Sequence, residues 1–269
     1  MQTIENRTQL ALLQNDVLQS FRKWQFWGFL GWNDIAKQYR RSFIGPVWIT
    51  LNSAIFIVAF GLVGAQLFKF SVEDYLPYFC AGQIFFSFMS SLINEGCDTY
   101  INAHTFLKQT AYPKFAFVLR VVWRNLLLLG HNLAVIIAVL LWAGRLSQVQ
   151  WLPFLAGLLV TILAACFVVA IFGAIAARYR DVPMMVASIM QVSFFVTPVM
   201  WRPDQLTERA QWLVHLNPLA CYLEILRQPL LGLAASQQAW LTAVGLLAVL
   251  CVAFILLYRQ VRRRIVYWL

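Results

Sequence analysis

The chain has 269 residues, of which 61% are hydrophobic and 12% are charged, and its formal net charge is +10. Soluble domains carry about 25% charged residues, so this composition excludes an ordinary soluble protein and indicates an integral membrane protein. In such a protein the surplus of basic residues is explained by cytoplasmic loops rich in Lys and Arg, and no nucleic acid partner is expected.

The N-terminal segment, residues 1–41, is expected to lie in the cytoplasm. Residues 1–20 contain Glu5, Arg7 and Asp16 and no apolar core, so we expect no cleavable signal peptide and a poorly ordered or loosely helical stretch. Residues 21–41 mix aromatic and basic side chains, which is typical of an amphipathic helix lying in the membrane interface. A soluble helix that packs its aromatic residues on a core is the other interpretation.

Six uncharged windows follow, each at least twenty residues long and therefore long enough to cross a bilayer. We expect the third span to begin earlier, near Pro113, with Arg120 and Arg124 reaching toward the headgroups. The predicted fold is an all-α integral membrane protein with six transmembrane helices within residues 42–258. The windows are Ser42–Phe68, Tyr75–Asn94, Asn125–Gly144, Leu146–Ala177, Val182–Trp201 and Gln228–Tyr258.

The fifth window has the clearest boundaries. It lies between the Arg-Tyr-Arg-Asp sequence that ends at Asp181 and Arg202, and twenty helical residues would span roughly 30 Å. Pro183 suits a first helical turn, and Thr197-Pro198 is expected to end the helix. Six spans place sixteen of the 21 Lys and Arg residues on the side of both termini, which are therefore predicted to be cytoplasmic, with a basic tail at 259–269.

Two connections are too long for simple loops. Residues 97–114 are polar and suit one short helix closed by Pro113. Residues 202–235 lie outside yet stay apolar, and three prolines divide them into pieces too short to span. We expect two short re-entrant or interfacial helices there, between the fifth and sixth spans.

The chain lacks the motifs of a catalytic protein. It has no G-x-x-x-x-G-K-[ST], H-E-x-x-H or G-x-S-x-G sequence, and its five cysteines have no metal-ligand spacing. We therefore predict a non-enzymatic chain without a metal or cofactor of its own. The span interiors carry His131 and no mid-depth Asp, Glu, Lys or Arg, which argues against an ion-coupled carrier and favours an external motor.

Two sets of side chains are candidates for a substrate pathway. In the second span, Gln83, Ser87, Ser90 and Asn94 follow helical spacing and form a polar stripe, which either joins helices or faces a wet pathway. Aromatic rings near the first span suit the C–H faces of sugars, although such rings also pack against lipid or other helices. This aromatic set comprises Tyr39, Phe43, Trp48, Phe56 and Phe60.

Three stretches together resemble the membrane subunit of type-2 ABC exporters, and within these the O-antigen and capsule polysaccharide permeases. They are YRRSFIGPVW at 39–48, the segment 94–114, and the stretch from Arg178 to Arg202. The resemblance implies a multi-pass protein of the bacterial inner membrane that acts in lipopolysaccharide biosynthesis. It also implies a homodimer with two partner ATPase subunits, which hold the ATP and Mg²⁺, and a polysaccharide cargo linked to undecaprenyl diphosphate.

The resemblance also assigns roles to segments. Residues 98–112 would be a coupling helix that docks on the ATPase, the 178–181 turn a second contact, and residues 204–235 outer gate helices. The family's usual pair of lysines is Lys108-Gln109 here, so no particular salt bridge is carried over. The implied coupling residues are Asn102, His104, Phe106, Lys108, Tyr112, Arg178, Arg180 and Asp181.

A basic cytoplasmic surface would attract a lipid diphosphate, although the positive-inside rule explains the same bases. These residues are Arg22, Lys23, Lys37, Arg40 and Arg41.

Three alternatives to export of an O-antigen polysaccharide remain. They are an exporter of teichoic acid, an exporter of small hydrophobic compounds or drugs, and a membrane-embedded enzyme acting on lipid-linked glycans. For the enzyme, the chain offers no acid, base or metal constellation.

Overall fold

The computed structural model describes residues 2–40, 44–45, 47–110, 112–205, 207, 211–262 and 264–269, without the side chains of 2–9, 39, 213 and 215. These residues form helices and no strand. The α-helices are α1 (Gln2–Arg22), α2 (Trp24–Tyr39), α3 (Val47–Phe68), α4 (Val72–Asp98), α5 (His104–Gln109), α6 (Phe115–Trp142), α7 (Trp151–Arg178), α8 (Val182–Val196), α9 (Trp212–His215), α10 (Pro218–Leu230), α11 (Gln237–Val261) and α12 (Ile265–Trp268), with short 3₁₀ turns at Leu146–Gln148 and Pro203–Gln205.

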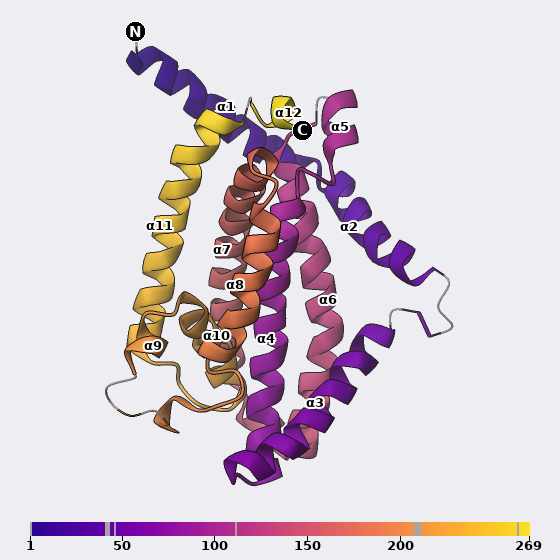
Figure 1. Ribbon diagram of the computed structural model, residues 1–269, viewed down its shortest axis with the longest axis vertical. Coiled ribbons are helices and arrows are strands. Elements are labelled where there is room, and N and C mark those ends of the chain that lie inside the picture. Colours follow the sequence, from indigo (N-terminus) through magenta and orange to yellow (C-terminus); the bar gives the residue numbers. More distant parts are fainter. Residues whose placement is uncertain are drawn as a thin grey trace.

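Five of the described helices are long and apolar enough to cross a membrane: α3, α4, α6, α7 and α11. Figure 1 shows α4, α6, α7 and α8 side by side, with α11 flanking them. Helices α1, α5 and α12 lie at one end of this bundle, where both termini are found, and α9 and α10 lie at the opposite end. The all-helical, multi-pass membrane architecture predicted from the sequence is confirmed at this level.

Helix α8 is shorter than the uncharged window that contains it. It ends at Val196 after 15 residues, about 22 Å, directly before the Thr197-Pro198 pair that was expected to end it. Thr197 adopts an extended conformation (φ −81°, ψ 138°) because the following Pro198 disfavours the helical region for the residue before it. The predicted end of the helix is therefore confirmed, but the twenty uncharged residues do not form one helix, and α8 is not among the five helices of spanning length.

The N-terminal stretch is more regular than expected, since α1 is a continuous helix of 21 residues. Helix α2 then extends from that end of the bundle toward α3 (Figure 1). Trp24, Phe29 and Trp32 are exposed on α2. The position of α2 in the membrane interface stays a prediction.

Helix α4 is the centre of the bundle and contacts α3, α6, α7, α8 and α10. Small residues permit its close approach to α7. A Cβ atom on Gly173 would lie 2.9 Å from the carbonyl oxygen of Gly96, so neither helix could carry a larger residue there without moving. The centre of the described core is therefore the α4–α7 pair.

Candidate functional site

The predicted coupling residues gather at the end of the bundle that carries the termini. The 178–181 turn contacts the C-terminal helix α12: the Arg180 side chain donates a hydrogen bond to the Trp268 carbonyl (3.4 Å), and the Arg178 guanidinium lies 5.3 Å from the Trp268 ring centre. Helix α12 in turn contacts α5 and α7. Asn102, His104, Lys108 and Asp181 are exposed at this end. We call α5, α12 and the 178–181 turn the terminal platform.

Helix α5 is attached to α2 through aromatic side chains. The ring of Phe26 stacks on Tyr112 with centroids 4.1 Å apart, and it meets Phe106 and Phe117 edge-on at 6.4 and 5.7 Å. The Lys23 ammonium lies 4.5 Å from the centre of the Tyr112 ring. A displacement of α5 would therefore be passed to α2.

A second junction of this end centres on Asp16, which sequence reasoning missed. Its carboxylate is 3% exposed and accepts hydrogen bonds from the backbone N–H groups of Lys114 and Phe115, both at 3.1 Å. It therefore caps the N-terminus of α6 from another helix. Arg262, beyond α11, forms a salt bridge to the same carboxylate at 3.2 Å. One carboxylate thus joins α1, α6 and the end of α11.

Lys114 belongs to the same junction. Its ammonium donates to the Arg262 carbonyl. Burial, and then the nearby Arg262 charge, lower the pKa of Lys114 below its usual value. The signal that could have identified Asp16 is an acid in the apolar second half of α1, a helix that packs against α6 and α11.

The basic residues expected to attract a diphosphate lie along α1 and α2. Arg22, Lys23, Lys37 and Arg40 are exposed, and Arg41 lies outside the described residues.

Arg120 and Arg124, which were expected to reach toward the lipid headgroups, form ion pairs within the protein. Arg120 forms a two-pronged salt bridge with Asp34 of α2, both N–O distances being 2.7 Å. Arg124 pairs with Glu95 at 3.3 Å. Both arginines bind carboxylates within the protein instead of reaching toward headgroups, because acids on α2 and α4 come within hydrogen-bond range.

The four side chains of the predicted polar stripe form hydrogen bonds along α4 itself. Gln83 donates to the Ser87 hydroxyl at 3.2 Å, and Asn94 donates to the Ser90 carbonyl at 2.9 Å. Ser87 also lines a cavity of about 310 Å³ between α3, α4 and α6, with Trp48 at the start of α3 and Gln38 of α2. The side of α4 that faces this cavity carries Ser87, Ser91 and Glu95, so it is shifted from the predicted stripe.

The side chain of His131 also interacts with the backbone of its own helix, since its ring nitrogen Nδ1 lies 2.8 Å from the Leu127 carbonyl oxygen.

Two of the described aromatic pathway candidates lie in one cluster with Phe79 of α4. The Phe60 ring stacks on Phe56 and on Phe79, with centroid distances of 5.8 and 5.2 Å, and the Phe56 and Phe79 rings are tilted to each other at 6.3 Å. Trp48 and Phe56 are 48% and 45% exposed, so they remain available to lipid, a partner or a substrate. The Tyr39 side chain and Phe43 lie outside the described part of the chain.

At the opposite end, the break after α8 is held by α4 and α10. Arg227 of α10 is 2% exposed and donates to the Pro198 carbonyl at 2.6 Å. Tyr78 donates to the Trp201 carbonyl and Tyr75 to the Met200 carbonyl, each at 2.9 Å. We call residues 197–202 the outer break. The carbonyl groups of Pro198, Met200 and Trp201 thus accept hydrogen bonds from side chains of α4 and α10, which compensates for the bonds that a continuing helix would have made.

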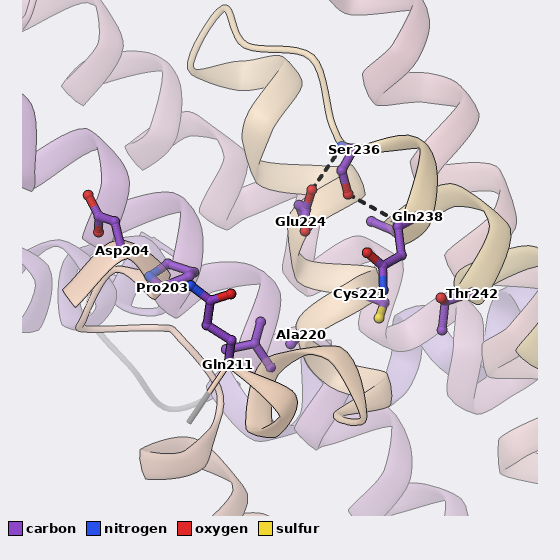
Figure 2. A pocket seen from close by; sticks show the side chains of 11 residues that line it. Pro203, Asp204, Gln211, Ala220, Cys221, Glu224, Ser236, Gln238 and Thr242 are labelled. Carbon is purple, nitrogen blue, oxygen red and sulfur yellow. Dashed lines mark hydrogen bonds between the residues drawn. The ribbon is translucent and has the colours of Figure 1, made fainter. Parts of the chain in front are cut away.

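A small cavity of about 300 Å³ lies beside α10 at the same end. Figure 2 shows Asp204 and Gln211 on one side, and Glu224, Ser236, Gln238 and Thr242 on the other. The Ser236 N–H donates to Glu224 Oε1 at 2.8 Å, so that carboxylate already has a partner. Burial raises the pKa of the Cys221 thiol, and the nearby Glu224 charge raises it further. Among the described residues, no group of three or more His, Cys, Asp or Glu side chains could hold a metal ion.

Comparison with known proteins identifies relatives over most of the chain. Residues 25–231 match the family model described as ABC-2 type transporter. An O-antigen export system permease protein RfbA of Klebsiella pneumoniae is 21% identical over 190 residues, covering 70% of this chain and 73% of the relative. A protein of the same description from Myxococcus xanthus is 20% identical over 188 residues, covering 69% of this chain and 72% of the relative. The family model covers most of the chain, which therefore belongs to the ABC-2 type transporter family.

Proposed function

We propose that this protein is the membrane subunit of an ATP-driven exporter that moves a polysaccharide linked to undecaprenyl diphosphate across the bacterial inner membrane. The observation that carries this proposal is the family match over residues 25–231, together with relatives named as O-antigen export permeases. An O-antigen type of polymer is the cargo that these names favour. Teichoic acid is a variant that differs in the polymer alone.

The energy would come from a partner ATPase that carries the ATP and Mg²⁺. The sequence has no P-loop motif of its own. The terminal platform is the docking surface in this proposal, since α5, α12 and the 178–181 turn lie together there. The stacked pair Phe26 and Tyr112 would pass movement of the coupling segment to the interface helix α2.

The proposed assembly contains two copies of this chain and two ATPase subunits. In each copy, α8 together with the outer break would be the fifth of six spans, before α11. The terminal platform would be cytoplasmic because most Lys and Arg residues lie on that side when six crossings are assigned. Helices α9 and α10 would then lie at the outer face as a gate.

The substrate would first meet the exposed bases of α1 and α2, which suit a diphosphate. Trp48 and Phe56 are exposed aromatic rings along α3 and could pack against the passing glycan.

Reconstitution tests this proposal. The full chain and its candidate ATPase would be placed in proteoliposomes, and ATP hydrolysis measured with undecaprenyl-diphosphate-linked oligosaccharide or with the carrier lipid alone. We expect the glycan-linked lipid to stimulate hydrolysis more than the bare carrier does. Equal rates with both lipids would contradict the proposed cargo.

One observation favours a second candidate, an exporter of small hydrophobic compounds. An apolar cavity of about 430 Å³ lies between α4, α7, α8, α10 and α11, bordered by Met89, Phe172 and Leu250. In that case hydrophobic compounds would stimulate the ATPase, and replacing Met89 and Leu250 with larger residues would abolish the stimulation. The glycan proposal expects no such stimulation.

A further inference from the structure

The cavity between α3, α4 and α6 is polar although those three helices are apolar and of spanning length. It brings together Glu95, Arg124, Asn125 and Asn132. Polar groups inside a membrane bundle are costly unless they find partners, so a shared polar cavity needs a physical explanation.

Two of these side chains have atoms without a partner. Asn132 Oδ1 and Arg124 Nε are buried, and neither hydrogen-bonds to any described residue. Buried polar atoms in proteins nearly always have a hydrogen-bond partner. The Asn132 oxygen therefore needs a donor, and the Arg124 nitrogen needs an acceptor, from a ligand or from water. The ligand must therefore offer both donors and acceptors, as hydroxyl groups do.

The charges in the cavity already balance. Glu95 accepts from Arg124 at 3.3 Å and from Asn125 at 2.9 Å, and Glu95 and Arg124 are the charged residues among the described lining of the cavity. A phosphate would need a cation that is not already paired, because a buried uncompensated charge is strongly unfavourable. The ligand that fits this cavity is therefore uncharged.

The size and shape of the cavity restrict the ligand further. Ligand pockets generally measure about 300–1,000 Å³, so 310 Å³ suits one small ring with its substituents. Trp48 borders the cavity, and its indole offers a flat apolar face with a polar N–H edge. We propose that this cavity binds one uncharged, hydroxyl-rich ring of the size of a single sugar residue. The assignment of that ring to the exported glycan rests on the proposed function, whereas the binding site itself does not.

Saturation-transfer NMR on the full chain in lipid nanodiscs tests the site without ATP or export. The probes are D-glucose, D-galactose, D-mannose, L-rhamnose and N-acetylglucosamine, with glucose 1-phosphate and glucuronate as charged comparators. The variants Asn132→Leu, which removes the unpartnered acceptor, and Ser91→Leu, which fills the cavity, are compared with Asn94→Leu. Asn94 is the matched control because it is also an asparagine of a spanning helix with an unpartnered Oδ1, but it does not line this cavity.

We expect at least one neutral sugar to receive magnetisation and the charged comparators to receive little. Binding in Asn132→Leu and Ser91→Leu should be about five- to tenfold weaker, the effect of losing one or two buried hydrogen bonds, and unchanged in Asn94→Leu. Absence of transfer to every neutral sugar would mean that the cavity holds water alone and would overturn the proposal. Equal weakening in all three variants, or stronger transfer to the charged sugars, would also overturn it.

A photo-reactive residue at position 128, which lines the same cavity, identifies the source of the ring. A cross-link to glycan in cells that make the polymer assigns the ring to the exported chain. Nanodisc binding without such a cross-link assigns the site to a free sugar. Neither result depends on ATP-driven export, so failure of the proposed function and failure of this site give different readings.

Discussion

The guanidinium of Arg227 lies 3.8 Å from the ring centre of Tyr78, and the same side chain donates to the Pro198 carbonyl. This pair fastens α10 to α4 across the outer break. Gly82 makes room for it, because a Cβ atom there would lie 2.9 Å from the Val199 carbonyl oxygen and 3.3 Å from an Arg227 nitrogen. The position and path of the outer break thus depend on one arginine, one tyrosine and one glycine.

Replacing Arg227 with Lys should loosen the outer break. Lysine keeps the charge but cannot reproduce the planar stacking and the directed N–H groups. We expect a loss of roughly 1.5–3 kcal/mol in the free energy of unfolding, and faster maleimide labelling of a cysteine placed at Met200. Arg145→Lys is the control, since Arg145 pairs with an exposed Asp74 and such pairs are worth about 0–1 kcal/mol. Identical labelling rates in the two variants would contradict the role of Arg227.

Replacing Asp16 with Asn should release α1 from the bundle. The amide retains one acceptor oxygen but leaves Arg262 without its ion-pair partner and removes a negative charge from the N-terminus of α6. The expected cost is roughly 1–3 kcal/mol, visible as faster tryptic cleavage after Arg22 and Lys23. Asp181→Asn, which changes an exposed acid at the same end, should cleave at the wild-type rate. If Asp16→Asn also does so, the junction does not hold α1.

Replacing Phe26 with Ala should uncouple ATP hydrolysis from export. Three aromatic contacts disappear, each worth about 0.5–1.5 kcal/mol, while the exposed surface of α5 is unchanged. The ATPase should therefore still bind and hydrolyse ATP, but export should fall. Phe29→Ala on the same helix removes an exposed ring and should leave export intact. Loss of ATPase binding in the Phe26 variant would show that the cluster forms the docking surface itself.

Modification of Cys221 should depend on pH. Its pKa is raised above the usual thiol value, so little thiolate is present at pH 7, and the fraction rises as the pH increases. In a variant that retains Cys221 as its one cysteine, we expect a membrane-impermeant thiosulfonate to react slowly at pH 7, with a rate that rises about tenfold per pH unit and is still rising at pH 9. The reaction should proceed from the outside of intact spheroplasts. A rate that levels off before pH 9, as for an unperturbed thiol, would contradict the raised pKa, and protection until the cells are lysed would contradict the proposed orientation.

The sequence predicted the long helices well because their signal is additive over twenty or more residues. Residues 72–98 contain the whole predicted window 75–94, and residues 115–142 and 151–178 cover most of the windows 125–144 and 146–177. The early start of α6 near Pro113 was confirmed. The uncharged run of twenty residues did not reveal the length of α8, but the Thr197-Pro198 pair did. The helix ends at Val196 because Pro198 disfavours the helical region for Thr197.

The sites were harder to predict because their partners lie far apart in the chain. Asp16 meets Lys114 and Arg262, and Arg227 meets Tyr78, at separations that no local pattern encodes. Arg120 and Arg124 lie within a predicted span, where snorkelling is the usual expectation, and the pairing with Asp34 and Glu95 follows from tertiary packing. The spacing of Gln83 and Asn94 identified the polar helix correctly but not the side that borders the cavity.

The most direct measurement follows lipid-linked glycan on each side of the inner membrane after deletion of this protein from its host. We expect glycan-linked undecaprenyl diphosphate to accumulate on the cytoplasmic side, the surface polymer to disappear, and the wild-type chain to restore it. An unchanged surface glycan, with no cytoplasmic accumulation, would contradict the export of a lipid-linked polysaccharide.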